Sequence, residues 1–211
     1  MNHRNTEIRD YFDDWAGNYD LTVKAGKWRA PRRVFEMARP YLKKNSRVLD
    51  VAIGTGMLSE YFRKLSAGVN ITGLDISRGM LRQCADKGHI ADSLIPCDVE
   101  HQRFPVPDRN YDLTIASGVF EFLATVKNVF TEMARVTRPG GIIAFSYIPN
   151  SLSKTGMHDD DGDVKVYSQS SRKIEQMMAG LGVHKLASSP QFIAYDPGHA
   201  YPNKVFLGQV L

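Results

Sequence analysis

The sequence predicts an α/β protein built around a doubly wound, seven-stranded sheet. Apolar strand-like runs alternate with amphipathic helical stretches, which gives five βα-type units between about residues 47 and 148. A further helix and two closing strands, at about 185–195 and 204–211, complete the seven. A chain of 211 residues with 43% hydrophobic and 24% charged residues can bury one core of ordinary size, so we expect a single domain overall.

A glycine-rich turn follows the first predicted strand, in the run Val48-Leu49-Asp50-Val51-Ala52-Ile53-Gly54-Thr55-Gly56. Glycine tolerates positive φ and has no Cβ, so the backbone can approach a ligand while the N–H groups of the next helix point at it. Asp75 ends the second strand nineteen residues after Gly56, which is where Rossmann-type folds hold ribose hydroxyls. The run therefore predicts a nucleoside-containing cofactor.

Two details separate the cofactor classes that use such a turn. A dinucleotide fingerprint has glycine three residues after its second glycine, where this chain has Ser59. Asp50 adds a carboxylate to the motif, which would repel a pyrophosphate and suits a cationic or hydrogen-bond-donating ligand. An NAD-dependent oxidoreductase is therefore the less favoured interpretation.

The run Val48–Gly56 resembles motif I of the class I S-adenosylmethionine-dependent methyltransferases, with Ala52 and Ile53 where that family usually has glycine and a small residue. Residues 111–123 are similar to the family's pattern after strand four, except that Phe122 replaces a histidine. Residues 132–141 are similar to its Glu-x-x-Arg-Val-Leu-Lys-Pro-Gly-Gly string. The resemblance covers roughly residues 10–150, beyond which it rests on element order, and it implies a Rossmann-like sheet whose last strand is antiparallel.

The same resemblance implies S-adenosyl-L-methionine as the cofactor and S-adenosyl-L-homocysteine as the product. In that family the acid matching Asp98 accepts a hydrogen bond from the adenine amine, and Arg29 matches a residue that we expect to reach the methionine carboxylate. Carried over position by position, the predicted cofactor-binding residues are Tyr11, Trp15, Tyr19, Arg29, Asp50, Ala52, Gly54, Thr55, Gly56, Asp75, Ile76, Met80, Asp98, Val99, Ser117, Gly118 and Phe122.

Residues 1–42 are predicted to form an N-terminal helical lid on the methyltransferase domain, residues 43–211. Tyr11, Phe12, Trp15 and Tyr19 recur every one to four residues, so one face of the first helix is aromatic. Residues 11–20 are also similar to the Phe-Asp-x-Trp-Ala-x-x-Tyr-Asp opening of small-molecule methyltransferases of type 11/12. Aromatic faces attract cations such as a sulfonium. The alternative is that this stripe only packs on the core.

Methyl transfer from a sulfonium depends mainly on aligning the acceptor and excluding water. An acceptor hydroxyl or carbon acid would also need a base, for which His199, His158 and Tyr19 are the candidates, although each can equally be an ordinary loop or core residue. His158 and the three aspartates after it fall in residues 149–163, which have no regular periodicity and are predicted to be a loop. Consecutive acids in a loop are usually solvated, so we expect no metal site.

We expect a small-molecule methyl acceptor, because no Asn/Asp-Pro-Pro-Tyr/Phe motif follows the fourth strand. In the family, that motif marks methylation of amide or exocyclic nitrogens in proteins and DNA. A net charge of +4 is not a nucleic-acid signature, although the basic run 24–33 keeps an RNA-directed methyltransferase or a non-catalytic cofactor-binding module as alternatives. No apolar run is long enough to span a membrane and only two cysteines occur, so we expect a cytoplasmic monomer or homodimer without a membrane partner.

Overall fold

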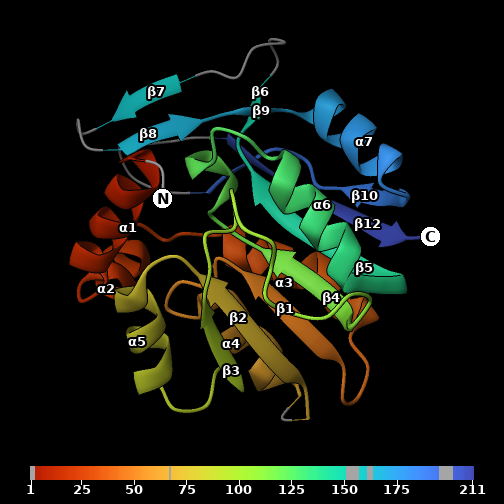
Figure 1. The fold of residues 1–211 in the computed structure, drawn as a ribbon, viewed down its shortest axis with the longest axis horizontal. Helices are drawn as coiled ribbons and strands as arrows, with labels where there is room; N and C mark the ends of the chain where they lie inside the picture. Colours follow the sequence, from red (N-terminus) through yellow and green to blue (C-terminus); the bar gives the residue numbers. More distant parts are fainter. Residues whose placement is uncertain (1–2, 67, 151–156, 161–163, 195–201) are drawn as a thin grey trace.

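The computed structural model describes residues 3–66, 68–150, 157–160, 164–194 and 202–211, and it has a central sheet with helices on both faces (Figure 1). In spatial order the strands of the sheet are β10 (Val183–Ser188), β12 (Pro202–Val210), β5 (Thr137–Tyr147), β4 (Tyr111–Ala116), β1 (Arg47–Val51), β2 (Asn70–Asp75) and β3 (Ser93–Pro96). Neighbouring strands from β3 to β5 are parallel, whereas β12 is antiparallel to both β5 and β10. The predicted seven-stranded sheet with an antiparallel last strand is confirmed, with the short β11 (Phe192–Ile193) paired to β12 in addition.

Both faces of the sheet are buried, and the residues of β1 pack into a core on each face. Alternate residues of a strand point to opposite faces. Val48 packs in one core with residues of α3 (Ala30–Ala38) and α4 (Met57–Leu65). Leu49 and Val51 pack in a second core with residues of α6 (Lys127–Val136) and α7 (Ser171–Gly180). A strand covered on both sides needs a nearly continuous apolar run, which β1 has apart from its exposed first residue, Arg47, and the buried Asp50.

The N-terminal segment divides between two places. α3 packs against β4, β5 and β12 and belongs to the layers around the sheet. α1 (His3–Trp15) packs against α5 (Arg78–Asp86), and α2 (Tyr19–Ala25) follows it near the carboxyl ends of the parallel strands (Figure 1). Two 3₁₀ turns, η1 (Arg39–Tyr41) and η2 (Phe120–Phe122), complete the described helical elements. Within residues 1–42, α1 and α2 are thus the part that can cover a site at the strand ends.

Residues 149–163, predicted to be an irregular loop, contain two short strands. β6 (Pro149–Asn150) pairs with β9 (Gln169–Ser170), and β7 (Met157–Asp160) pairs antiparallel with β8 (Val164–Tyr167). The prediction was wrong for these segments, because backbone pairing forms β7 although its sequence has no alternation of apolar and polar residues. The remaining residues of that stretch, 151–156 and 161–163, lie outside the described residues.

An ion pair between the buried Glu132 and the half-buried Arg135 of α6 is hydrogen-bonded to the loop before β4. Glu132 is 6% exposed and accepts hydrogen bonds from the Phe104 N–H (2.7 Å) and from Arg135 Nε (2.9 Å). Arg135 also donates to the Phe104 carbonyl at 3.0 Å. The two side chains therefore satisfy backbone groups of a loop that has no strand to pair with.

Replacing Glu132 with alanine is expected to lower the free energy of unfolding by about 2–4 kcal/mol, because it leaves the Phe104 N–H and the Arg135 guanidinium without their carboxylate. Arg103→Ala is the control, since its ion pair with Asp108 is exposed and should leave stability unchanged. Urea denaturation of both variants measures the difference. A Glu132→Ala variant as stable as the wild type would contradict this role for the ion pair.

Candidate functional site

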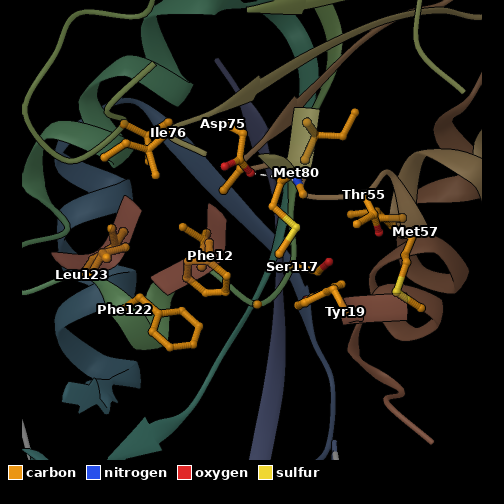
Figure 2. Close-up of a pocket in the computed structure, with 18 of the residues that line it drawn as sticks. Phe12, Tyr19, Thr55, Met57, Asp75, Ile76, Met80, Ser117, Phe122 and Leu123 are labelled. Carbon is orange, nitrogen blue, oxygen red and sulfur yellow. Dashed lines mark hydrogen bonds between the residues drawn. The ribbon is translucent and has the colours of Figure 1, made fainter. Parts of the chain in front are cut away.

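A cavity opens at the carboxyl ends of β1, β2 and β4, beneath α1 and α2 (Figure 2). Its lining combines apolar and aromatic side chains with a few carboxylates, as small-molecule sites do. Figure 2 shows Phe12 and Phe122 toward one end, Thr55 and Met57 toward the other, and Asp75 between them. The cavity therefore lies where ligands bind in doubly wound sheets.

The turn after β1 forms the floor of the cavity and has an unusual backbone. Ala52, Gly54 and Gly56 have φ values of +58°, +55° and +87°. A Cβ on Gly56 would lie 2.7 Å from Ile90 Cγ2 and 2.8 Å from Cys84 Sγ, so glycine is required there for space as well as for conformation. Ala52 adopts the same left-handed region with a side chain, at a cost of about 1–2 kcal/mol.

Asp75 connects this turn to the end of β2. Its Oδ2 accepts from the Gly54 N–H at 2.8 Å, and its Oδ1 accepts from the Ser77 N–H at 2.9 Å. Burial raises the pKa of Asp75 to about 6, and the nearby carboxylate of Asp13 acts in the same direction. Each carboxylate oxygen keeps a lone pair, so Asp75 can still accept hydrogen bonds from a ligand.

Two other carboxyls with buried oxygen atoms lie near the cavity without lining it. Asp50 is 1% exposed on β1 and accepts from the Ser59 hydroxyl of α4 at 2.7 Å; burial raises its pKa to about 7. Glu121 of η2 has an Oε2 with no hydrogen-bond partner in the described part of the chain, and burial raises its pKa to about 7 as well. Both side chains titrate near neutrality for lack of solvent.

Aromatic side chains of α1 and α2 form the cover of the cavity. Phe12 meets Phe122 edge to face at a ring separation of 5.1 Å, and Trp15 meets Tyr19 at 4.8 Å. Trp28, just after α2, packs so closely on Gly118 that a Cβ there would lie 2.4 Å from the indole Cζ2. The rings therefore bring the N-terminal helices against the loop that follows β4.

Polar contacts hold the same two helices to the strand ends. Asp13 of α1 accepts from the Ser77 hydroxyl and the Gly79 N–H, both at 2.6 Å, at the start of α5. Asp20 of α2 accepts from the Thr55 hydroxyl at 2.6 Å and pairs with Lys87 at 2.7 Å. These contacts fix the cover over the glycine-rich turn and over the neighbouring helix.

At the other end of α1, Arg4 pairs with Glu100 at 3.1 Å and donates to the Phe122 carbonyl. Its guanidinium also lies over the Tyr167 ring, 5.0 Å from the centroid. Arg4 thus connects α1 to the segment after β3, to η2 and to β8.

The structure brings most of the sequence-predicted site residues together. Twelve of them line the cavity: Tyr19, Ala52, Gly54, Thr55, Asp75, Ile76, Met80, Asp98, Val99, Ser117, Gly118 and Phe122. Five predicted cofactor-binding residues do not line it: Tyr11, Trp15, Arg29, Asp50 and Gly56. Tyr11 and Trp15 pack beside Phe12, with ring separations of 5.2 and 6.2 Å, and the exposed Arg29 donates its backbone N–H to the Ala194 carbonyl.

The two predicted catalytic histidines are not at the described cavity wall. His158 belongs to β7, where its backbone pairs with Val166, and His199 lies outside the described residues. Tyr19 does line the cavity. Their catalytic roles remain predictions.

Sequence reasoning missed nine of the lining residues: Ile8, Phe12, Trp28, Ile53, Met57, Leu58, Glu100, Val119 and Leu123. Phe12 belongs to the aromatic stripe of α1, so its periodicity could have included it. Glu100 follows Asp98 closely enough to share its strand end. Trp28 gave no local signal, because its position depends on how the chain passes from α2 to α3.

The described residues contain neither a metal-binding cluster nor a helix able to span a membrane. No three His, Cys, Asp or Glu side chains among them are placed to hold a metal ion together. None of their helices combines the length and the apolar composition that crossing a bilayer requires.

A parallel sheet in this order, an antiparallel β12 between β5 and β10, a glycine-rich turn after β1 and acids after β2 and β3 define the class I methyltransferase fold. Comparison with known proteins agrees. Residues 49–145 match the family model described as a methyltransferase domain. The ubiquinone/menaquinone biosynthesis C-methyltransferase UbiE of Burkholderia cenocepacia (strain HI2424) is 32% identical over 164 residues, which cover 72% of this chain and 66% of that protein.

Two solved structures share the fold at low identity. Magnesium protoporphyrin IX methyltransferase (ChlM) from Synechocystis PCC 6803, with bound S-adenosylhomocysteine, superposes with a TM-score of 0.73 at 16% identity, covering 99% of this chain and 100% of that one. The second is the Burkholderia thailandensis 1,6-didemethyltoxoflavin-N1-methyltransferase, with bound 1,6-didemethyltoxoflavin and S-adenosylhomocysteine. It superposes with a TM-score of 0.73 at 14% identity, covering 97% of this chain and 88% of that one. The chain belongs to the class I S-adenosylmethionine-dependent methyltransferases, whose cofactor is S-adenosylmethionine. It spans just under two thirds of the length of the UbiE relative.

The buried carboxyls predict that the protein loses stability as the pH rises. The folded pKa values of Asp50, Asp75 and Glu121 are raised, so the folded state keeps protons that the unfolded chain releases near its ordinary carboxyl pKa. Their contribution to stability is complete below about pH 4 and is lost as the pH rises through about 6 to 7.

Asp50→Asn is expected to remove the part of this pH dependence that comes from the Asp50 carboxyl. The fall in the free energy of unfolding between about pH 5 and about pH 8 should shrink by on the order of 2 kcal/mol. Urea denaturation at both pH values measures it, with the exposed Asp10→Asn as the control that should keep the wild-type dependence. An unchanged pH dependence in Asp50→Asn would show that its carboxyl is not the titrating group.

Proposed function

We propose that this chain binds S-adenosylmethionine in the cavity and transfers the methyl group to a small-molecule acceptor. The observation that carries the proposal is the charge of the cavity. Its described lining includes the carboxylates of Asp75, Asp98 and Glu100, of which Glu100 is paired with Arg4 from outside the lining, and it includes no lysine, arginine or histidine. S-adenosylmethionine has a sulfonium, an ammonium and one carboxylate, so its net charge is positive. An acidic cavity with aromatic walls favours it, whereas the pyrophosphate of NAD would be repelled.

Two aspartates would hold the nucleoside of the cofactor. Asp75 has free lone pairs on both oxygens after its bonds to Gly54 and Ser77, which fits a ribose diol. Asp98 comes after the neighbouring strand β3 and lines the same cavity, which fits the adenine amine. The left-handed backbone at Gly54 leaves the turn without a side chain where the ligand would approach.

The chain's part in the reaction is to orient the acceptor and to exclude water. When bound, the cofactor supplies an already activated methyl group, so alignment lowers the barrier more than covalent assistance does. α1 and α2 cover the cavity, and Phe12 and Trp28 give it apolar walls. Tyr19 is the predicted proton acceptor whose side chain lies at the cavity, so it is our candidate base for an acceptor hydroxyl or carbon acid.

The acceptor that suits these walls is a planar molecule of modest size. Phe12, Trp28 and Phe122 present rings, and flat acceptors pack well against rings. The UbiE relative is named as a C-methyltransferase of quinone biosynthesis, which supports a carbon acceptor among those to be tried. RNA is the less favoured acceptor, because helices cover the strand ends where a polymer would have to enter.

Calorimetric titration with S-adenosylmethionine, S-adenosylhomocysteine and NAD tests the proposal. We expect the first two to bind and NAD not to bind. Asp75→Ala should weaken the binding of S-adenosylhomocysteine by about 10- to 100-fold. The substitution removes charge-assisted hydrogen bonds to the ribose and leaves the Gly54 N–H without its acceptor. Asp108→Ala, at an exposed carboxylate outside the cavity lining, is the matched control.

Binding of NAD alone would overturn the cofactor assignment. If S-adenosylhomocysteine binds, release of this product in the presence of small aromatic acceptors or of total RNA separates the two acceptor classes. Binding of the cofactor without turnover on either class would favour the non-catalytic alternative.

A further inference from the structure

A groove adjoins the cavity on the outside of the protein. It lies between α2 and α4, and its lining includes Lys24, Lys27 and Lys64. Trp28 and Met57 line both the groove and the cavity, so these two side chains form the partition between them. A molecule that reaches into the cavity past this partition would leave its outer end in the groove.

The groove has an excess of positive charge. Of its two carboxylates, Asp20 is engaged by Lys87 at 2.7 Å and by the Thr55 hydroxyl at 2.6 Å. Glu60 is engaged by Lys64 at 2.7 Å. Lys24 lies 3.9 Å from Asp20, and Lys27 has no ion-pair partner among the described residues. Lys27 therefore offers an uncommitted ammonium group at the rim.

The backbone at Lys27 is the second observation. Its φ is +50°, in the left-handed region just after the end of α2, where glycine is the favoured residue. A lysine at this position is unfavourable for the backbone, and backbone strain of this kind is enriched at functional positions.

We propose that the groove binds an anionic group, a carboxylate or a phosphate, carried by the methyl acceptor, and that Lys27 selects for it. The inference rests on the proposed function, because it takes the cavity beyond Trp28 and Met57 as the place of methyl transfer. A planar acceptor with an acidic substituent would place its ring at the partition and its anion beside Lys27 and Lys24. Acidic aromatic molecules are then the acceptor class to screen first.

The test uses benzoate, phenyl phosphate and the neutral benzamide as probes of the protein saturated with S-adenosylhomocysteine. Ligand-observed NMR measures the three dissociation constants. We expect the better of the two anions to bind about three- to five-fold more tightly than benzamide at low salt, and the advantage to shrink as salt is added. Comparison of the two anions distinguishes a carboxylate site from a phosphate site.

Lys27→Gly removes the positive charge without harming the fold. Glycine suits the left-handed backbone, so the melting temperature of the variant should be no lower than that of the wild type. It should lose the preference for the anions. The matched control is Arg109→Gly, which also replaces an exposed cation at a φ of +50°, but in the turn before β4 and outside the groove lining. This control should keep the preference.

Equal binding of anions and benzamide to the wild type, or an unchanged preference in Lys27→Gly, would overturn the inference. So would salt-sensitive RNA binding that is lost in Lys27→Gly while no anion preference is seen, since the lysine would then serve a nucleic acid. Failure of S-adenosylhomocysteine to bind in the saturation step contradicts the proposed function instead, so the two failures are distinguishable.

Discussion

The hydrogen bond from the Gly54 N–H to the Asp75 carboxylate, 2.8 Å long, ties the turn after β1 to the end of β2, and the cavity depends on it. The turn folds back on β2 instead of continuing beyond it, with the Ile53 N–H donating to the Leu74 carbonyl at 2.8 Å. This approach requires glycine in β2 as well, since a Cβ on Gly73 would lie 2.5 Å from Ile53 Cδ1. Because the turn lies low against β2, the space above the strand ends stays open and becomes the cavity.

The cover of that space depends on contacts of two kinds. The ion pair of Arg4 has a buried partner in Glu100. The ion pair of Asp20 with Lys87 is partly exposed on both sides, and such pairs contribute little. The rings of Phe12 and Trp28 bury apolar area against Phe122 and Gly118, which contributes more. The polar contacts therefore determine where α1 and α2 sit, and the rings add apolar burial to the attraction. None of these four ring-contact residues belongs to either of the two cores that cover the faces of the sheet.

The sheet and the strand-end residues could be predicted because their signals are local. Alternation, the glycine spacing and the acids after β2 and β3 each occupy a few consecutive residues, and parallel strands bring their carboxyl ends to one edge. Trp28 could not be predicted, because its place against Gly118 depends on a long-range chain path. The strand β7 was missed because backbone pairing forms it and its side chains carry no pattern. Asp50 was predicted to bind the cofactor because it belongs to the glycine-rich motif, but it does not line the cavity. The alternation of side chains along β1 places Asp50 on the same face as Val48, toward α4, and this geometry could have been read from the sequence.

The arrangement of charge links the two proposals. The described lining of the cavity is acidic, whereas the groove across Trp28 and Met57 is basic. A cationic cofactor is attracted to the first region and repelled by the second, and an anionic substituent experiences the reverse. Two ligands that meet at the partition would therefore be kept in opposite orientations, with the sulfonium on the inner side and the acid of the acceptor on the outer side. Such sorting orients both reactants without any group that takes part in bond making, which is the kind of assistance that a methyl transfer needs.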